Sequence, residues 1–269
     1  MEVTFFILLF LIGACLGSFL CCQARRLHLK ATAKRGSKKL NPRSVCLHCH
    51  KQLKWYDNIP IISWLVLRGH CRYCKKPIGS AEIISELGTG LAFIALGTTI
   101  NFSTADAFTW ATFIAVLLLT LTLIFLAIYD GLYGELPLTC LIVAIAFAAI
   151  ILILRIVITL STASFTPTLI VDPLLSVLIL SGLYLLLYLV SKGKWVGDGD
   201  WLLSLAIAIA LASPWLALIT LFLTNLLACL YALPTLKKSR SHQIHLGPFL
   251  VIAFIIVIVF STPLLEIIK

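Results

Sequence analysis

Charged side chains are scarce in this sequence. They make up 12% of the 269 residues, and the acidic ones number only 11 against 21 Lys and Arg residues. Hydrophobic residues reach 61%, whereas soluble domains contain about 45–50%. Long apolar runs recur along most of the chain. This composition excludes an ordinary soluble domain and predicts a polytopic membrane protein.

The basic residues give the chain a formal net charge of +10, which raises the question of a nucleic-acid partner. No nucleic-acid-binding motif accompanies that charge, and 14 of the 21 Lys and Arg residues lie between Arg25 and Lys76. Such clustering is typical of a cytoplasmic loop in a membrane protein, where basic residues also face anionic lipid. We therefore expect the lipid bilayer, and no nucleic acid, as a partner.

The N-terminus lacks the polarity of a secretory signal. Its apolar stretch, residues 3–22, follows Met-Glu-Val and precedes Arg25 and Arg26, whereas a signal peptide carries its positive charge first. The stretch is therefore predicted to be a retained helix that ends in the cytoplasm. Its GxxxG pattern, Gly13 and Gly17, is expected to pack helices within the chain.

Most of the apolar stretches have the length of a transmembrane helix, which needs about 20 residues. The stretch 201–233 is too long for one upright span, and Pro214 interrupts it. Two helices there keep Lys237, Lys238 and Arg240 on the cytoplasmic side, as the positive-inside rule requires. The sequence thus predicts an all-α polytopic membrane protein with about eight transmembrane helices, over residues 3–22, 82–101, 107–129, 136–160, 171–190, 201–233 as a pair, and 247–266.

The loop after the first helix carries two CxxC motifs separated by 21 residues. Four thiolates at such a spacing suit a tetrahedral zinc ion, and the spacer is close to that of zinc ribbons. Structural disulfides are not expected in a loop that faces the reducing cytoplasm. We therefore predict a small, zinc-ribbon-like cytoplasmic loop between helices 1 and 2, in which a structural zinc ion is bound by Cys46, Cys49, Cys71 and Cys74.

Two aspartates far apart in the sequence are predicted to share the cytoplasmic membrane face. Asp130 lies at the end of the third predicted helix, and Asp200 lies at the start of the sixth. Ionisable groups at membrane depth are costly and are functional by default. Two adjacent carboxylates share a proton, so that one can activate a water while the other polarises a peptide carbonyl. A single aspartate at a helix start is also a common N-cap, which is the alternative for Asp198.

A set of motifs along the chain resembles the type IV prepilin peptidases. The run GDGD at 197–200 is similar to the GxGD motif of intramembrane aspartyl proteases, and the tetracysteine loop is similar to the cytoplasmic domain of the family. The segment GACLGSFLCCQARRL resembles the family's opening signature, and IHLGPFL resembles its final-helix motif. Asp130 followed by Leu136-Pro137 matches the first catalytic aspartate, and Glu86 stands where the family has a glutamate. The ordered set spans about residues 10–255 and is specific, whereas GxGD alone is weak.

The resemblance implies a membrane-embedded aspartic endopeptidase with Asp130 and Asp200 as its catalytic pair. It would cleave the short basic leader of prepilins or pseudopilins after a glycine, at the cytoplasmic face of the cell (inner) membrane, for a type IV pilus, type II secretion or competence system. Gly197 and Gly199 would leave room for the substrate backbone, and Asp198 would tune the pair electrostatically.

The same resemblance implies a division of the chain and a second activity. The expected parts are a first transmembrane helix (1–22), a cytoplasmic tetracysteine domain (23–81), and a transmembrane peptidase domain (82–269) that carries both aspartates. Many family members also N-methylate the new N-terminus with S-adenosylmethionine. No residue of the sequence identifies a site for this methyl donor, so the cofactor-binding residues stay unknown.

Three other kinds of protein remain open. A broader GxGD protease would show no preference for glycine before the cleaved bond. A non-enzymatic, zinc-bearing assembly factor of a secretion or pilus system would not need Asp130 or Asp200. A transporter is disfavoured by the scarcity of charge inside the spans, because Arg155, near the outer end of the fourth helix, is expected to extend toward the interface.

Overall fold

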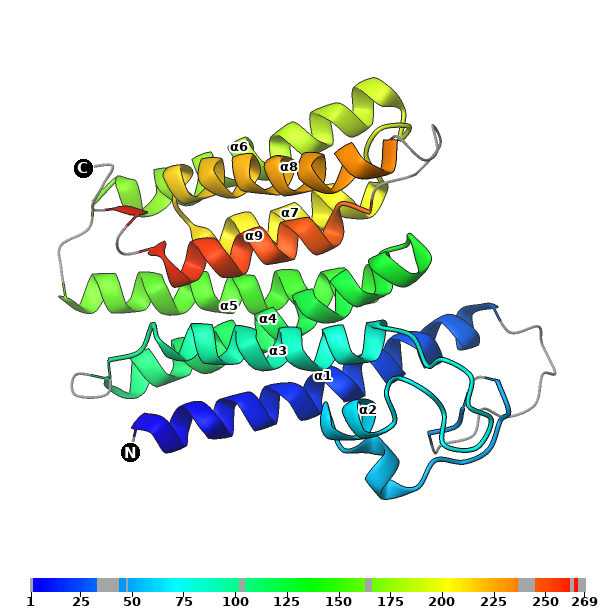
Figure 1. The fold of residues 1–269 in the computed structure, drawn as a ribbon. Helices are drawn as coiled ribbons and strands as arrows, with labels where there is room; N and C mark the ends of the chain where they lie inside the picture. The colour runs from blue at the N-terminus through cyan, green and yellow to red at the C-terminus, as the bar shows by residue number, and fades with distance from the viewer. Residues whose placement is uncertain are drawn as a thin grey trace. The chain divides into compact units, whose positions relative to one another are not determined.

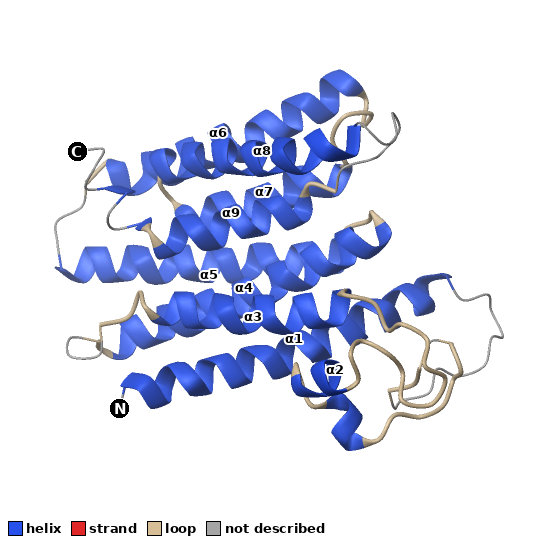
Figure 2. Cartoon of the chain, in the orientation of Figure 1, coloured by secondary structure: helices blue, strands red, loops and turns tan. Residues whose placement is uncertain are grey.

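In the computed structural model, the regular elements of the described residues are helices, joined by loops (Figure 1). It describes residues 2–32, 44–46, 48–101, 105–162, 166–236, 245–261 and 264–265. These residues form no β-strand, only two isolated β-bridges in loops (Figure 2). The helices are α1 (Glu2–Thr32), η1 (Trp55–Asn58), α2 (Ile62–Val66), α3 (Ala81–Gly97), α4 (Ala107–Tyr133), α5 (Leu138–Thr162), α6 (Thr168–Ser191), α7 (Asp198–Leu211), α8 (Pro214–Leu236) and α9 (Gly247–Val259).

The helices agree with the prediction of an all-α, multi-pass membrane protein. Five of those in the described part of the chain are long and apolar enough to cross a membrane, namely α1, α4, α5, α6 and α8. Three shorter helices, α3, α7 and α9, occupy the other predicted spans and have 17, 14 and 13 residues. Five of the predicted spans are therefore confirmed by helix length and composition, and a shorter helix lies at each of the other three predicted positions.

The predicted break near Pro214 is confirmed. Helix α7 ends at Leu211, Ala212 adopts a left-handed conformation with φ of 46°, and α8 begins at Pro214. Proline suits the first turn of a helix, because its missing N–H would have no partner there. The basic residues used to predict this turn, Lys237, Lys238 and Arg240, lie outside the described residues.

Some predicted helix boundaries are wrong. Helix α1 continues ten residues beyond the predicted end at residue 22 and reaches Thr32. The extension contains Gln, Ala, Leu, Arg and Lys, which favour helix, and no Gly or Pro. The hydropathy of the sequence identified only the part of α1 that is apolar enough to lie in lipid. In the same way α3 ends at Gly97 rather than 101, and α9 ends at Val259 rather than 266.

The chain divides into two compact units, Met1–Gly97 and Thr98–Lys269. In the first unit, α1 packs along α3. A Cβ atom at Gly13 would lie 2.8 Å from the backbone oxygen of Thr89, and one at Gly17 would overlap the oxygen of Ser85. The two glycines therefore let the helix backbones approach closely, as predicted for this GxxxG pattern.

In the second unit, the short helix α7 packs against α5 and α6 and also contacts α8 and α9. Five of its residues are completely buried: Leu203, Ser204, Ala206, Ile207 and Ala208. Hydroxyl groups of α6 bind its backbone, because Ser176 donates to the oxygen of Ala208 and Ser181 donates to that of Trp201. This packing fixes α7 and the carboxylates at its N-terminus.

Arg155 differs from its expected role as a residue that extends to the interface. Its guanidinium donates a hydrogen bond of 2.8 Å to the backbone oxygen of Leu211, the last residue of α7. The last carbonyl groups of a helix have no partner within the helix. Arg155 satisfies one of them at the end of a helix that is too short to reach far across a bilayer.

Candidate active site and metal centre

Asp130 lies on the last turn of α4 and is 5% exposed. The helix ends at this position because Gly134 takes the left-handed conformation, with φ of 68°, and donates its N–H to the Asp130 backbone oxygen. The Asp130 carboxylate accepts the N–H of Gly247, at the start of α9, at 3.0 Å. It also lies 3.7 Å from Nδ1 of His245. Three segments therefore meet at this carboxylate.

Asp200 lies on the first turn of α7. Its carboxylate accepts the backbone N–H of Gly197, the N-cap residue, at 3.0 Å. Asp198, the residue expected as an alternative N-cap, is instead the first residue of the helix and is exposed. The alternative that Asp198 is the N-cap of α7 is therefore wrong, and the Asp200 side chain makes the capping contact. One oxygen of Asp200 accepts this N–H, while the other accepts none from a described residue.

The carboxylates of Asp130 and Asp200 interact electrostatically, although 70 positions separate them in the sequence. Asp198 also contributes to the electrostatic environment of Asp200. Two carboxylates that interact in this way resist simultaneous ionisation. A pair of this kind can act as general base and general acid at one place, as hydrolysis of an amide requires.

The two glycines of the GDGD run have different surroundings. Gly197 is exposed, and a Cβ atom there would lie 3.3 Å from the Asp200 carboxylate. Gly199 is buried, and a Cβ atom there would lie 2.6 Å from Cβ of Leu136. The space at Gly199 is thus filled by the linker after α4 rather than left open for a substrate. Gly197 carries no side chain that could cover the Asp200 carboxylate, and its predicted role in substrate approach stays a prediction.

The structure adds residues that the sequence reasoning did not assign to this site. Gly247 and His245 belong to the IHLGPFL segment, which resembled a family motif without a stated role. A Cβ atom at Gly247 would lie 2.7 Å from the Asp130 carboxylate, so only glycine fits there without displacing a neighbour. Tyr184 of α6 is 2% exposed, interacts electrostatically with Asp200, and accepts a hydrogen bond from Asn225. A lone tyrosine in an apolar helix gives no sequence signal.

The four predicted zinc ligands come together in the loop of the first unit. Their Sγ atoms, from Cys46, Cys49, Cys71 and Cys74, all lie within 4.8 Å of one another. The Cys46 and Cys74 sulfurs are 3.8 Å apart, and a tetrahedral Zn–S bond of about 2.3 Å requires roughly that spacing. The cluster could therefore hold a metal ion in a closed site.

The two CxxC turns have the same local structure. In each, the N–H of the first cysteine binds the oxygen of the residue five positions on, from Cys46 to Lys51 and from Cys71 to Lys76. A β-bridge flanks each turn, Val45 to Gln52 and His70 to Pro77. Such paired turns are how a zinc ribbon presents two edges of a tetrahedron.

One thiol of the cluster is prepared for metal binding. Burial acts to raise the pKa of Cys46, but the backbone N–H groups of Cys49 and His48 outweigh burial and lower the pKa to about 7. The thiolate is the form that binds metal.

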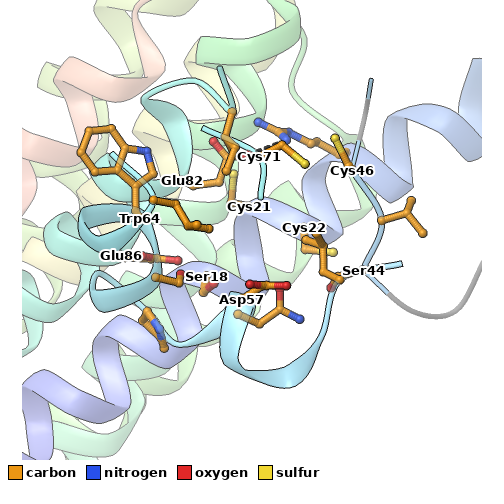
Figure 3. A pocket seen from close by; sticks show the side chains of 18 of the residues that line it. Ser18, Cys21, Cys22, Ser44, Cys46, Asp57, Trp64, Cys71, Glu82 and Glu86 are labelled. Atoms are coloured by element: carbon orange, nitrogen blue, oxygen red, sulfur yellow. Dashed lines mark ion pairs between the residues drawn. The ribbon is translucent and has the colours of Figure 1, made fainter. Parts of the chain in front are cut away.

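A cavity of about 480 Å³ opens beside the cysteine cluster, within the first unit (Figure 3). Its walls come from α1, α3 and the loop between them, and include Cys46 and Cys71. Figure 3 shows Ser18, Glu82 and Glu86 on one side and Asp57 on the loop. The volume lies in the range of small-molecule binding pockets. No motif in the sequence predicted this cavity.

The chain is similar to several known proteins that share one name. Residues 11–100 match the model of the Bacterial Peptidase A24 N-terminal domain. An Aeromonas hydrophila protein, "Prepilin leader peptidase/N-methyltransferase", is 32% identical over 79% of this chain and 69% of its own length. A protein of the same name from Dichelobacter nodosus is 29% identical over 80% of this chain and 70% of its own length.

Other matches are stronger but shorter. The protein of that name from Myxococcus xanthus is 44% identical, but the match spans 34% of this chain and 25% of that relative. No solved structure matches the chain.

Proposed function

Because this chain belongs to the prepilin leader peptidase/N-methyltransferase family, we propose that it is an aspartic endopeptidase with Asp130 and Asp200 as its catalytic pair. The observation that carries the proposal is the meeting of these two carboxylates from separate helix ends. The GDGD run, with Gly197, Asp198 and Gly199 beside Asp200, supports the assignment to GxGD proteases.

In the proposed reaction the two carboxylates hold one proton between them. The ionised carboxylate takes a proton from water as the water oxygen attacks the carbonyl carbon of the scissile peptide bond. The protonated carboxylate donates to the carbonyl oxygen. The resulting tetrahedral diol collapses, the C–N bond breaks, and the amine leaves with a proton from the first carboxylate. The products are a shortened protein and its leader.

The contacts of Asp130 give that residue a fixed geometry for this step. The N–H of Gly247 occupies one carboxylate oxygen at 3.0 Å, and His245 lies beside the other. A carboxylate held by a backbone group loses little freedom when substrate binds, which favours the reacting arrangement. We assign a positioning role to Gly247 and leave the acid and base roles unassigned between the two aspartates.

The proposed substrates are prepilins or pseudopilins, whose long apolar helix would lie in the bilayer beside the spans of this protein. The relatives carry the name of this substrate class. The cleavage site would lie at the cytoplasmic face of the inner membrane, where the basic residues between Arg25 and Lys76 attract anionic lipid. Asp198 would tune the pair, and an unshifted pH profile of cleavage in Asp198→Asn would contradict that role.

A second function, N-methylation of the new N-terminus, is favoured by the cavity of the first unit. The relatives are named for this activity, and a cavity of about 480 Å³ suits a small-molecule methyl donor such as S-adenosylmethionine. The residues of this cavity would hold the donor, whose sulfonium would supply the methyl group to the amine nitrogen, leaving a neutral thioether, while the amine would lose one proton. A structural zinc ion on the four cysteines would hold the adjoining wall.

Cleavage is tested by co-expression with a prepilin and a gel mobility shift. We expect full processing by the natural chain, and none by Asp130→Asn or Asp200→Asn. Exchange of the glycine before the cleaved bond should also abolish processing. Cleavage that tolerates this exchange would favour a broader GxGD protease, and processing by either aspartate variant would favour a non-enzymatic assembly factor.

A further inference from the structure

The cavity of the first unit contains three carboxylates, and two of them are neutralised by arginines. Glu82 of α3 forms an ion pair with Arg25 of α1. Asp57 of the loop forms an ion pair with Arg72, with 2.7 Å between carboxylate oxygen and guanidinium nitrogen. The third carboxylate, Glu86, has no ion pair among the described residues, so it has no counterion there when it is ionised.

The partners of Glu86 are neutral groups. Its Oε2 atom accepts the backbone N–H of Ile61 at 2.7 Å, and it accepts a hydrogen bond from the hydroxyl of Ser18. The residue is 6% exposed, and Figure 3 shows its carboxylate beside Ser18. Burial of an ion without a counterion is unfavourable. A cation bound in the cavity would relieve that penalty.

The fold itself explains the hydrogen bonds of Glu86 but not its charge. Ile61 has φ of 64°, an uncommon conformation for a β-branched residue, and the contact with Glu86 holds it there. A glutamine in place of Glu86 has the same length and could accept the same N–H through its amide oxygen. The contact with the Ile61 N–H therefore requires only an acceptor atom, which a glutamine would also supply. The choice of an acidic residue at position 86 is not explained by this contact.

A second group on the cavity wall also suits a cation. The indole ring of Trp64 is held by a hydrogen bond from its N–H to the Gly79 oxygen at 3.1 Å. The same side of the ring packs on Gly69, where a Cβ atom would lie 2.9 Å from Cζ2 of the ring. The face of an aromatic ring attracts organic cations, and tryptophan does so best. The ring is thus fixed before any ligand binds.

From these contacts we infer that Glu86 binds the positively charged centre of the ligand in this cavity, in the step that transfers a methyl group. The inference rests on the proposed methylation and assigns it a residue. Two cations take part in that reaction, the sulfonium of S-adenosylmethionine and the terminal ammonium of the processed protein. Both would be attracted by the same carboxylate, and only a binding experiment separates them.

The test measures discrimination by charge. S-adenosylmethionine and S-adenosylhomocysteine differ by one methyl group and one positive charge, so the ratio of their dissociation constants reports the charge recognition. The ratio is measured by calorimetry on the full, zinc-loaded chain in lipid nanodiscs. We expect the natural chain to prefer the sulfonium, and Glu86→Gln to lower that preference at least tenfold. A second arm compares a pilin-like peptide that has a free N-terminus with its acetylated form.

Two controls keep the outcome interpretable. The double variant Arg25→Gln with Glu82→Gln removes the neutral ion pair but leaves Glu86 unchanged. The ratio of dissociation constants for the two nucleosides and the ratio for the two peptides should therefore both persist. Prepilin cleavage by Glu86→Gln should match the natural chain, because both proposed catalytic aspartates belong to the second unit. If Glu86→Gln loses discrimination in either arm, the inference is supported. The arm that changes then identifies the cation, sulfonium or ammonium, that Glu86 binds. Unchanged ratios in both arms, or no binding of any of the four ligands, would overturn it even while cleavage continues.

Discussion

The two compact units of this chain use polar groups in different ways. In the first unit, α1, α3 and the loop between them gather arginines, carboxylates and thiols around a cavity. In the second unit, long apolar helices bury hydroxyl groups against backbone oxygens, and two carboxylates at helix ends meet. The aspartate site of the second unit, at helix ends, depends on few residues. The cavity of the first unit, which loop residues also line, depends on many weak contacts. We therefore expect substitutions in the second unit to impair cleavage, and substitutions in the first unit to impair ligand binding.

The largest expected effect comes from the proposed catalytic pair, Asp130 and Asp200. Asp130→Asn and Asp200→Asn should each lower the rate of prepilin cleavage by about 10²–10⁴-fold, because each removes one partner of the acid–base pair. The rate is measured with purified enzyme and prepilin in detergent. Binding of S-adenosylmethionine by the same variants should be unchanged. A parallel loss of donor binding would show that the two functions are not separate.

Loss of the metal should affect the first unit most. The purified chain should contain one zinc ion, measured by mass spectrometry, and Cys71→Ser should lose it. Donor binding should then fall strongly, since Cys46 and Cys71 are part of the cavity wall, while cleavage falls less. Zinc should also dissociate as the pH falls, because protons compete with the metal for the thiolates.

The control for the zinc experiment is Cys229→Ser, which changes an exposed cysteine of α8 outside the cluster. Its zinc content and donor binding should equal those of the natural chain. Full zinc content in Cys71→Ser would contradict the four-cysteine site.

A smaller effect is expected from Gly247→Ala. The added methyl group would lie 2.7 Å from the Asp130 carboxylate, so the carboxylate or α9 must shift. A displacement of this size should lower kcat about tenfold with little change in KM. Gly182→Ala is the matched control, because a Cβ atom there has no neighbour closer than 3.6 Å. Equal rates for both variants would remove the positioning role of Gly247.

The smallest effect is expected from Arg155→Leu, which removes the hydrogen bond to the Leu211 oxygen. The free energy of unfolding should fall by about 1 kcal/mol, a typical value for one hydrogen bond. The lower stability would appear as a lower melting temperature in detergent. The cleavage rate per folded molecule should stay unchanged, because the bond lies at the end of α7 away from Asp200. The control is Thr159→Ala, which removes a side-chain hydrogen bond to the Arg155 backbone oxygen in the same helix.

Much of the architecture was predictable from local patterns. Apolar length marked the membrane helices, and the left-handed Ala212 and Pro214 separate α7 from α8 where a break was expected. Hydropathy missed the end of α1 at Thr32, because a helix can continue into water once its residues favour it. The family resemblance read from the ordered motifs is confirmed by the comparisons, whereas the roles of Asp130 and Asp200 stay predictions.

The sequence by itself determined which chemistry is present: two aspartates at opposite helix ends, and four cysteines at a spacing that suits one metal ion. Such information is local, because turn geometry and apolar length act over a few residues. Only the tertiary structure decided which groups meet. It brought Gly247 to Asp130, closed Leu136 over Gly199, and paired Glu82 with Arg25 while Glu86 received only neutral partners. These contacts join segments far apart in the chain, and only packing sets their distances.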